Sequence, residues 1–460
     1  MTVAAPTDRT ALVAWYRRNR ERTRRLFDLI EPSAYYTRPI ALRNPIVFYE
    51  GHLPAFTVIA FLQRGLGRPG VDARLERLFK RGIDPDSVEA AVPRSGARTA
   101  WPSREEILRF AAAVDDAFVE ALDEAPLDDA RAREGLFTAL EHEAMHQETL
   151  LYMWRRLPYA MKRGAGGPEG LGAGGPPAFA VADESGDSYG EAPRRSARRI
   201  ERARRRTGSP PGQVGIPAGP ATLGANRRHT VFGWDNEFDE HVVDVPAFEI
   251  DAHNVTNAEY LRFVEAGGRV PEFWSRRDPS IRSVPAGQAQ WFWRGMFEDI
   301  PLPGEWPVYV SQADAAAYAQ WRGRRLPTEA EYHRAAFGTP SGEERAFPWG
   351  DEPPDATRGN FDFERWEPAP VGSHPAGQSG WGVHDLMGNG WEWTSTVFAP
   401  FDGFRAMASY PEYSADFFDG EHIVLKGASP ATARELLRRS FRNWFRPNYP
   451  YVYATFRTAR

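Results

Sequence analysis

The chain has 460 residues, and its 57 basic and 62 acidic side chains leave a formal net charge of only −5. That balance argues against a protein built to coat nucleic acid or an anionic membrane. A hydrophobic fraction of 42% with 13% aromatic residues excludes a disordered chain, and the absence of cysteine excludes disulfides, cysteine-ligated metals and a thiol nucleophile. Any metal ion must therefore be held by His, Asp or Glu.

The N-terminal segment, residues 1–8, lacks the basic start and apolar core of a secretory signal. The sequence also contains no run of 18 apolar residues, which is the length a membrane-spanning helix needs. We therefore expect a cytoplasmic protein with no membrane span, whose partners include neither nucleic acid nor membrane.

The N-terminal part of the chain, up to Arg163, has the pattern of four amphipathic helices. The predicted helices begin at Asp8, at His52, at the capping box Ser103–Glu106 and at Asp128 or Asp129, and the second and fourth end near Leu66 and Arg156. Four helices that each carry an apolar face predict an antiparallel bundle over residues 1–163.

Residues 164–212 have the composition of a linker. Gly164-Ala-Gly-Gly-Pro168 recurs as Gly172-Ala-Gly-Gly-Pro176, and the stretch from Arg194 to Arg206 is dense in arginine. Nucleic-acid binding is one function for such a stretch, and a solvated linker or short exposed helix is the other. No aromatic residue interleaves the arginines, which favours the linker.

The remaining residues, 213–460, form a second domain with short apolar runs and frequent turn signals. Only Asn257–Glu265 and Ser311–Gly323 have a clear helical pattern. The predicted fold class is α+β with two domains, a four-helix bundle followed by a largely irregular domain held by buried aromatic side chains.

The clearest chemical signal is a pair of histidines on the fourth predicted helix. His142 and His146 are four positions apart, so both imidazoles lie on one helix face and can reach one ion. Glu148 lies roughly 200° around the helix from His146 and is a poor third ligand, better suited to the helix surface or to supporting a ligand. His52 is the only other histidine that precedes His229 and is the predicted third ligand.

A site made of histidines alone suits Fe(II), Zn(II), Ni(II) or Cu(II). The alternative is that these histidines are hydrogen-bonded core residues without a metal. The other seven histidines form no second pair at ligand spacing, so the bundle holds the one metal site evident in the sequence.

His142-Glu143-Ala144-Met145-His146 also matches the H-E-x-x-H pattern of zinc metalloproteases, in which the Glu is the general base. A protease would need substrate-binding elements and a third ligand just downstream, where this chain enters its Gly/Pro-rich linker. So short a match is weak evidence, and we disfavour this alternative.

The second domain carries a series of phrases whose order resembles the formylglycine-generating-enzyme domain, a C-type-lectin-like fold. They are Phe232–Glu237 (FGWDNE), Asn254–Tyr260 (NVTNAEY), Arg325–Tyr332 (RLPTEAEY), Phe347–Asp351 (FPWGD), Asp385–Thr394 (DLMGNGWEWT) and Ser440–Trp444 (SFRNW). Formylglycine-generating enzymes use active-site cysteines, so their activity is excluded here.

A DinB-like helical bundle fused to this domain resembles the ergothioneine-type sulfoxide synthases over nearly the whole chain. The resemblance implies a non-heme Fe(II) held by His52, His142 and His146. It also implies an O₂-dependent coupling of a thiol sulfur to the imidazole carbon of hercynine, which is Nα-trimethylhistidine. Three histidines leave up to three open positions on an octahedral ion, and we expect the catalytic cleft between the two domains.

The resemblance also implies residues that bind hercynine. Asn443 and Trp444 match the family's Arg-Asn-Trp segment, where an amide can bond a carboxylate or imidazole and an indole face suits a quaternary ammonium. Core packing is the alternative role for Trp444. Met145 stands where the family commonly has a glutamine.

Two further departures from the family concern the binding of the sulfur donor and the group that donates a proton near the iron. Phe445 and Tyr449 replace an Asp and an Arg that hold γ-glutamylcysteine in the actinobacterial enzymes, so that charged peptide would lose both partners. Phe398 and Phe401 stand where the family has tyrosines near the iron, which leaves the proton donor open, with a tyrosine of Tyr449–Tyr453 as one choice.

We therefore predict a neutral, aromatic donor pocket with Arg446 and Asn448 nearby. With Asn443 and Trp444, the predicted substrate-binding residues are Arg446, Phe398, Phe401 and Met145. Such a pocket resembles the selenoneine-synthase branch, in which a selenosugar is coupled to hercynine. An ergothioneine-type synthase that takes cysteine, γ-glutamylcysteine or another thiol is the runner-up. A lectin-like binding protein without turnover is the alternative from another class, and a metal ion with every position filled by protein would favour it.

Overall fold

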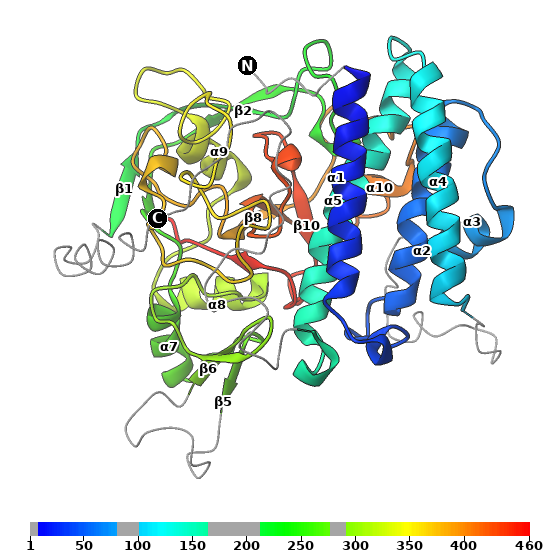
Figure 1. Cartoon of the computed structure of the whole chain (residues 1–460). Helices are drawn as coiled ribbons and strands as arrows, with labels where there is room; N and C mark the ends of the chain where they lie inside the picture. The colour runs from blue at the N-terminus through cyan, green and yellow to red at the C-terminus, as the bar shows by residue number, and fades with distance from the viewer. Residues whose placement is uncertain (1–7, 81–100, 164–211, 277–290) are drawn as a thin grey trace.

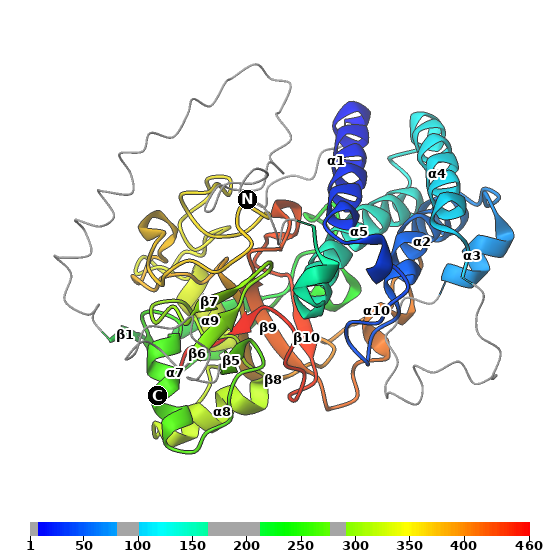
Figure 2. The ribbon, with the colours of Figure 1, turned by 60° about the horizontal axis from the view of Figure 1, so that its bottom comes forward.

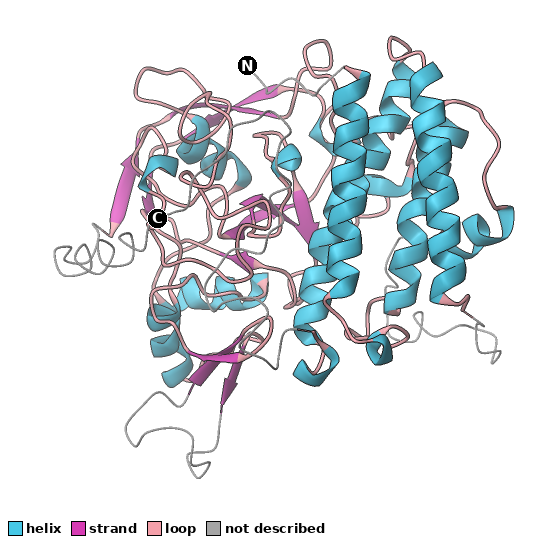
Figure 3. Cartoon of the chain, in the orientation of Figure 1, coloured by secondary structure: helices cyan, strands magenta, loops and turns pink. Residues whose placement is uncertain are grey.

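The computed structural model describes residues 8–80, 101–163, 212–276 and 291–460. Figure 1 shows a helical bundle standing beside a second domain of short strands, short helices and long loops, and Figure 3 shows how little of that second domain is regular. The α+β architecture predicted from the sequence is confirmed. The predicted linker and its arginine-rich stretch lie outside the described residues, except for Gly212.

The bundle consists of four long helices with a short fifth one at its side. They are α1 (Arg9–Asp28), α2 (Ile46–Thr57, continued by a π-helical segment Val58–Gly65), α3 (Ala73–Phe79), α4 (Arg104–Glu124) and α5 (Ala130–Arg156). Asp8, Ser103 and Asp129 cap the starts of α1, α4 and α5 through their side-chain oxygens, as predicted. Short 3₁₀ turns follow at Pro32–Ala34 and Tyr159–Met161.

Helix α2 begins at Ile46, well before His52, so the predicted start of this helix is wrong. Gly51 lies inside this helix and allows close packing, because a Cβ there would lie 2.3 Å from the Phe79 ring. The segment Ile46–Gly65 is long and apolar enough to cross a membrane, yet 94% of its apolar window is buried inside the protein. It is the central helix of the bundle and places His52 in the interior.

The second domain is organised by a four-stranded sheet in the order β10-β9-β8-β11 (Figure 2). These strands are β8 (Gly390–Val397), β9 (Ile423–Ala428), β10 (Asn443–Phe445) and β11 (Ala454–Thr455). Around them lie β1 (Gln213–Ile216) paired with β4 (Phe248–Asp251), β2 (Gly219–Leu223) paired with β3 (His241–Val245), and the antiparallel strands β5 (Trp274–Arg276), β6 (Trp291–Arg294) and β7 (Asp299–Pro301).

The helices of this domain are α7 (Asn257–Glu265), α8 (Gln312–Trp321), α9 (Glu329–Phe337) and α10 (Glu412–Ala415). The structure confirms the first two, and α9 was not predicted. Its signal was present, since Thr328 and Glu331 form a capping box, but the helix is short and buried on nearly all sides. A helix whose charged side chains are buried together with its apolar ones lacks the polar-out, apolar-in periodicity by which helices are recognised.

Helix α5 joins the two domains through buried charges that recur at heptad spacing. Glu148 accepts hydrogen bonds from Trp391 Nε1 (2.8 Å), Ser429 Oγ (2.8 Å) and Thr432 Oγ1 (3.0 Å) of the second domain. Arg155, one heptad later, pairs with Glu367 at 2.8 Å. Residues one heptad apart share a helix face, so this stripe of α5 belongs to the domain interface.

Replacing Glu148 by Ala is expected to lower the free energy of unfolding by about 2 kcal/mol, because three buried donors lose their acceptor. Urea unfolding followed by tryptophan fluorescence measures the change. The matched control is Glu120→Ala, which removes an exposed carboxylate from α4 and should leave stability unchanged. Equal stability of the two variants would contradict a structural role for Glu148.

Candidate metal and substrate site

Three histidines converge inside the bundle, one from α2 and two from α5. One ring nitrogen from each of His52, His142 and His146 lies within 4.8 Å of the other two. The Nε2 atoms of His142 and His146 are 3.1 Å apart, and the His52 ring centroid is 5.0 Å from each of the other two. His52 and His142 are buried and His146 is partly exposed.

The protein holds these imidazoles with aromatic rings and a backbone carbonyl. His52 Nδ1 lies 2.8 Å from the carbonyl oxygen of Phe79, so Nδ1 donates and the lone pair of Nε2 faces the other histidines. Phe56 stacks on His142 at 3.5 Å and Phe48 stacks on His52 at 5.1 Å. Each of these two rings is therefore fixed from behind.

This geometry fits a metal ion better than a set of core histidines. Two nitrogens bound to one ion at about 2.1 Å, with roughly 90° between them, lie about 3 Å apart, as His142 and His146 do. His52 Nε2 is buried without a hydrogen-bond partner in the protein, and the bond from its Nδ1 to a backbone carbonyl is typical of metal-ligating histidines.

The same surroundings keep the imidazoles neutral, which metal binding requires. Burial lowers the pKa of His52 to about 4. Burial, followed by repulsion from neighbouring imidazoles, holds the pKa of His142 well below its ordinary value, and burial and the charge of His52 do the same for the pKa of His146.

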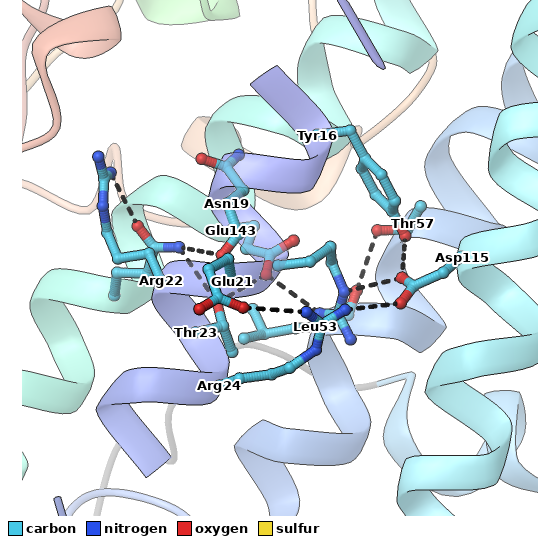
Figure 4. A network of polar contacts seen from close by, with 12 residues as sticks. Tyr16, Asn19, Glu21, Arg22, Thr23, Arg24, Leu53, Thr57, Asp115 and Glu143 are labelled. Atoms are coloured by element: carbon cyan, nitrogen blue, oxygen red, sulfur yellow. Dashed lines mark hydrogen bonds and ion pairs between the residues drawn. The ribbon is translucent and has the colours of Figure 1, made fainter. Parts of the chain in front are cut away.

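Neither Glu143 nor Glu148 is a ligand. Glu148 belongs to the domain interface described above, so it is buried and does not lie on the helix surface. Glu143 is turned toward α1, where it accepts hydrogen bonds from Arg20 Nη1 (3.0 Å) and Thr23 Oγ1 (2.6 Å). Figure 4 shows Glu143 within this network of α1 and Asp115. A protease base must face the metal-bound water, so the structure argues against the metalloprotease alternative.

The second domain approaches the histidines through one aromatic contact after another. The hydroxyl of Tyr413 in α10 lies 3.4 Å from Met145 Sδ, next to His146. The ring of Tyr413 meets the edge of Trp444 in β10 at 5.0 Å and stacks on Trp234 at 4.0 Å. Trp444 and its neighbour Asn443, the residues predicted to bind hercynine, are partly exposed. Tyr413 links Trp444 to the part of α5 that carries His146.

Tyr410 is a further residue of the site, and the sequence did not single it out. Its ring lies 4.9 Å from Phe56 and 6.0 Å from His142, so this phenol borders the histidine cluster. The sequence has Phe398 and Phe401 where a proton donor was expected. The chain continues past these phenylalanines and returns to the bundle at Tyr410 and Tyr413.

Three residues predicted to contact substrate have their side chains engaged by other residues of the protein. Phe398 is completely buried and stacks on Trp444 at 4.3 Å, so it supports the indole from behind. Phe401 packs on His241 at 4.4 Å and under the guanidinium of Arg442. Arg446 is partly exposed and pairs with Glu421 and with Asp419 (3.5 Å), so its charge is already neutralised. Phe398 has no surface open to a substrate and we correct it to a supporting residue, whereas substrate contact by Phe401 and Arg446 stays a prediction.

The residues predicted to form the donor pocket include a stacked aromatic pair, and a buried cation lies beside it. Phe445 and Tyr449 stack on each other at 5.2 Å with nearly parallel rings. Buried Arg43, just before α2, donates to the Tyr449 hydroxyl at 2.8 Å and to the Tyr152 hydroxyl at 2.5 Å. Its positive charge contributes to lowering the pKa of His146, so a cation lies near the histidine cluster. The sequence did not indicate this cation, because Arg43 is far along the chain from the predicted pocket residues at 445–449.

A cavity of about 820 Å³ lies between the bundle and the second domain, but on another side of α5. Trp15, Glu141, Phe232 and Arg438 are among the side chains that line it, and none of the three histidines does. Arg438 bridges Glu141 (2.8 Å) and Glu237 at its wall. The chemistry of the site therefore does not belong to this cavity.

Comparisons with known proteins agree with this arrangement. The model of the DinB superfamily matches residues 16–150, and the model of the sulfatase-modifying factor enzyme 1-like domain matches residues 197–460. The hercynine oxygenase of Mycolicibacterium thermoresistibile is 34% identical, with 100% of this chain and 96% of that protein covered. The chain belongs to the hercynine oxygenase family.

Other similarities are more distant or cover less of the two chains. Ergothioneine biosynthesis protein 1 of Neurospora crassa is 28% identical over 92% of this chain, which spans 54% of that longer protein. PvdO from Pseudomonas aeruginosa matches 54% of this chain and 93% of its own at 22% identity, with a TM-score of 0.39.

Replacing His52 by Ala is expected to abolish stoichiometric metal binding at the three-histidine centre, because only two ligands from one helix remain. Metal content after anaerobic loading with Fe(II) and desalting measures this. Glu148→Gln and the exposed His229→Ala serve as controls and should keep full occupancy. Full iron occupancy in His52→Ala would show that the third ligand lies elsewhere.

Proposed function

We propose that this protein is a non-heme Fe(II) enzyme that uses O₂ to couple a sulfur or selenium donor to the imidazole carbon of hercynine. The observation that carries the proposal is the series of ring contacts from His142 through Tyr410 and Tyr413 to Trp444. It supports the proposal because an indole face suits a quaternary ammonium, and three protein ligands would leave positions open on an octahedral ion. With a thiol donor, one donor, one hercynine and one O₂ give one sulfoxide and one water, so all atoms balance.

Bound Fe(II) would supply the activation of O₂ and accept electrons from the donor and the imidazole. The protein's own residues position the two organic substrates. Phe398 covers one face of the Trp444 indole, so the trimethylammonium group of hercynine would use the opposite face. The side-chain amide of Asn443 is next to it and can bond the carboxylate or the imidazole.

Tyr410 is the residue we propose to move a proton near the reacting atoms. Burial raises the pKa of Tyr410, so its hydroxyl stays protonated across the physiological range and can donate at its Oη. Phe56 and His142 hold its ring beside the cluster. Tyr413, whose hydroxyl is engaged with Met145, is placed to orient the acceptor side instead.

Two donor classes have a specific observation in their favour. The stacked rings of Phe445 and Tyr449 offer an aromatic wall to a sugar, which supports a selenosugar. Arg43, buried between Tyr152 and Tyr449, offers a cation to a carboxylate, which supports an amino-acid thiol such as cysteine. We propose the selenosugar first and cysteine second. A cytoplasmic location remains part of the proposal.

Replacing Trp444 by Ala should raise the dissociation constant of hercynine by about 5- to 30-fold, because a cation–π contact of about 1–2 kcal/mol is lost. Calorimetry on the anaerobic Fe(II) protein measures it. Trp321→Ala, which removes an exposed indole from α8, is the matched control. Wild-type protein should bind hercynine more tightly than histidine, and equal affinity for the two would contradict the acceptor assignment.

Tyr410→Phe should lower kcat by about 100-fold or more, since general acid catalysis contributes roughly that factor, while hercynine affinity stays unchanged. Tyr36→Phe, which alters an exposed phenol of the bundle, is the control. Stopped-flow kinetics with product analysis separates coupling from unproductive thiol oxidation. Unchanged coupling in Tyr410→Phe would assign the proton to another group.

The donor is identified by competition. Selenosugar, thiosugar, cysteine and γ-glutamylcysteine are mixed at equal concentration with the Fe(II) protein and hercynine, O₂ is added, and products are read by mass spectrometry. Selenosugar coupling is expected to dominate. Preferential coupling of cysteine, lost in Arg43→Met, would establish the second candidate, and coupling of none would favour a binding protein without turnover.

A further inference from the structure

The second domain gathers a group of metal-ligating side chains far from the three-histidine centre in sequence. His253 follows β4, His374 lies in the loop before β8, and His384 and Asp385 directly precede β8. None of these histidines is spaced as a ligand pair in the sequence, so the fold alone brings His253, His384 and Asp385 together, with His374 close enough to Asp385 to interact with its charge. His253 and His384 stack at 4.6 Å, and His253 Nδ1 is 4.0 Å from Asp385 Oδ2.

The loop around Gly372 is shaped to hold this group. The backbone N–H of Gly372 donates to Asp385 Oδ2 at 2.6 Å. Gly372 has φ +73°, and a Cβ there would lie 2.9 Å from His253 Cε1, so only glycine fits. Asp385 itself has φ +54°, an unusual conformation for a residue other than glycine.

Four polar atoms of this group are buried without a hydrogen-bond partner in the protein. They are the Nδ1 atoms of His253, His374 and His384, together with Asp385 Oδ1. The Asp385 side chain is only 1% exposed. Buried polar atoms are nearly always paired, and four unpaired ones in one cluster indicate a ligand that satisfies them together.

The chemistry of the four groups selects the ligand. Neutral imidazoles and a carboxylate offer lone pairs and one negative charge, which suits a divalent transition-metal ion and repels an anion. The nearby guanidinium of Arg457 donates to the His384 carbonyl oxygen at 2.8 Å and pairs with Glu392, so its charge is already balanced. We propose that His253, His384 and Asp385, with His374, form a second metal site of the zinc class.

The ligand atoms of this group are more widely spaced than those of the three-histidine centre. Among the described residues, only the three-histidine centre has its ligand atoms within 4.8 Å of one another. An ion must therefore pull the imidazoles toward Asp385, and the stacking of His253 on His384 would be lost. Three chain segments would then be tied together behind β8, the strand whose Trp391 bonds Glu148 of α5. The site is structural, and it does not depend on the function of the three-histidine centre.

The test titrates untagged, metal-free, full-length protein with ZnCl₂, by calorimetry and by zinc content after gel filtration. Wild-type protein should bind two equivalents, one at each site. His253→Gln, His384→Gln and Asp385→Asn should each bind one, whereas His52→Ala should lose the other equivalent and keep this one. The exposed His229→Gln is the control and should bind two.

A second readout is the unfolding temperature, which zinc should still raise in His52→Ala but not in His52→Ala combined with His253→Gln. If wild-type protein binds a single equivalent that disappears in His52→Ala, the proposal is overturned, whatever the folding of the other variants. Two equivalents retained in both His253→Gln and Asp385→Asn would overturn it as well. If wild-type protein binds zinc at the second site but not at the three-histidine centre, the proposed function is contradicted and the second site is not.

Discussion

The structure depends on one helix, α5, whose three faces carry three different kinds of buried polar group. One face points His142 and His146 into the bundle toward His52. A second turns Glu143 to Arg20 and Thr23 of α1. The third presents Glu141, Glu148 and Arg155 to the second domain, where each finds a charged or hydrogen-bonded partner. Leaving any of these groups unpaired would cost several kcal/mol, so the relative placement of the two domains is tightly constrained.

That constraint explains how a site is built from residues that lie far apart in the chain. The ligands are rigid because they are on helices and backed by aromatic rings. The groups that would contact substrate, such as Trp444 and Tyr410, come from the second domain and are brought to the open side of the histidines by the same interface. Positioning of this kind matters because reacting groups must meet within a few tenths of an ångström.

The sequence predicted the local features well and the long-range ones poorly. The helix cap Asp8 and the i, i+4 pair of His142 and His146 each depend on residues within about one turn of a helix, and the sequence predicted both. Tyr410 and Arg43 were missed because their relation to the histidines exists only through the fold. The ion pairs of Arg446 were not predicted for a related reason, since its acidic partners Asp419 and Glu421 precede β9 while Arg446 follows β10. The heptad recurrence of Glu141, Glu148 and Arg155 was visible in the sequence and could have indicated a second buried face of α5.

The central claim is that three histidines hold an iron ion that keeps positions open beside the hercynine-binding residues. Electron paramagnetic resonance of the anaerobic Fe(II) protein treated with nitric oxide tests it most directly, because only iron with an open position gives the S = 3/2 signal. The account predicts this signal, a change in its line shape on adding hercynine, and loss of that change in Trp444→Ala. Absence of the signal from fully iron-loaded protein would contradict the account and indicate an ion whose positions are filled by the protein.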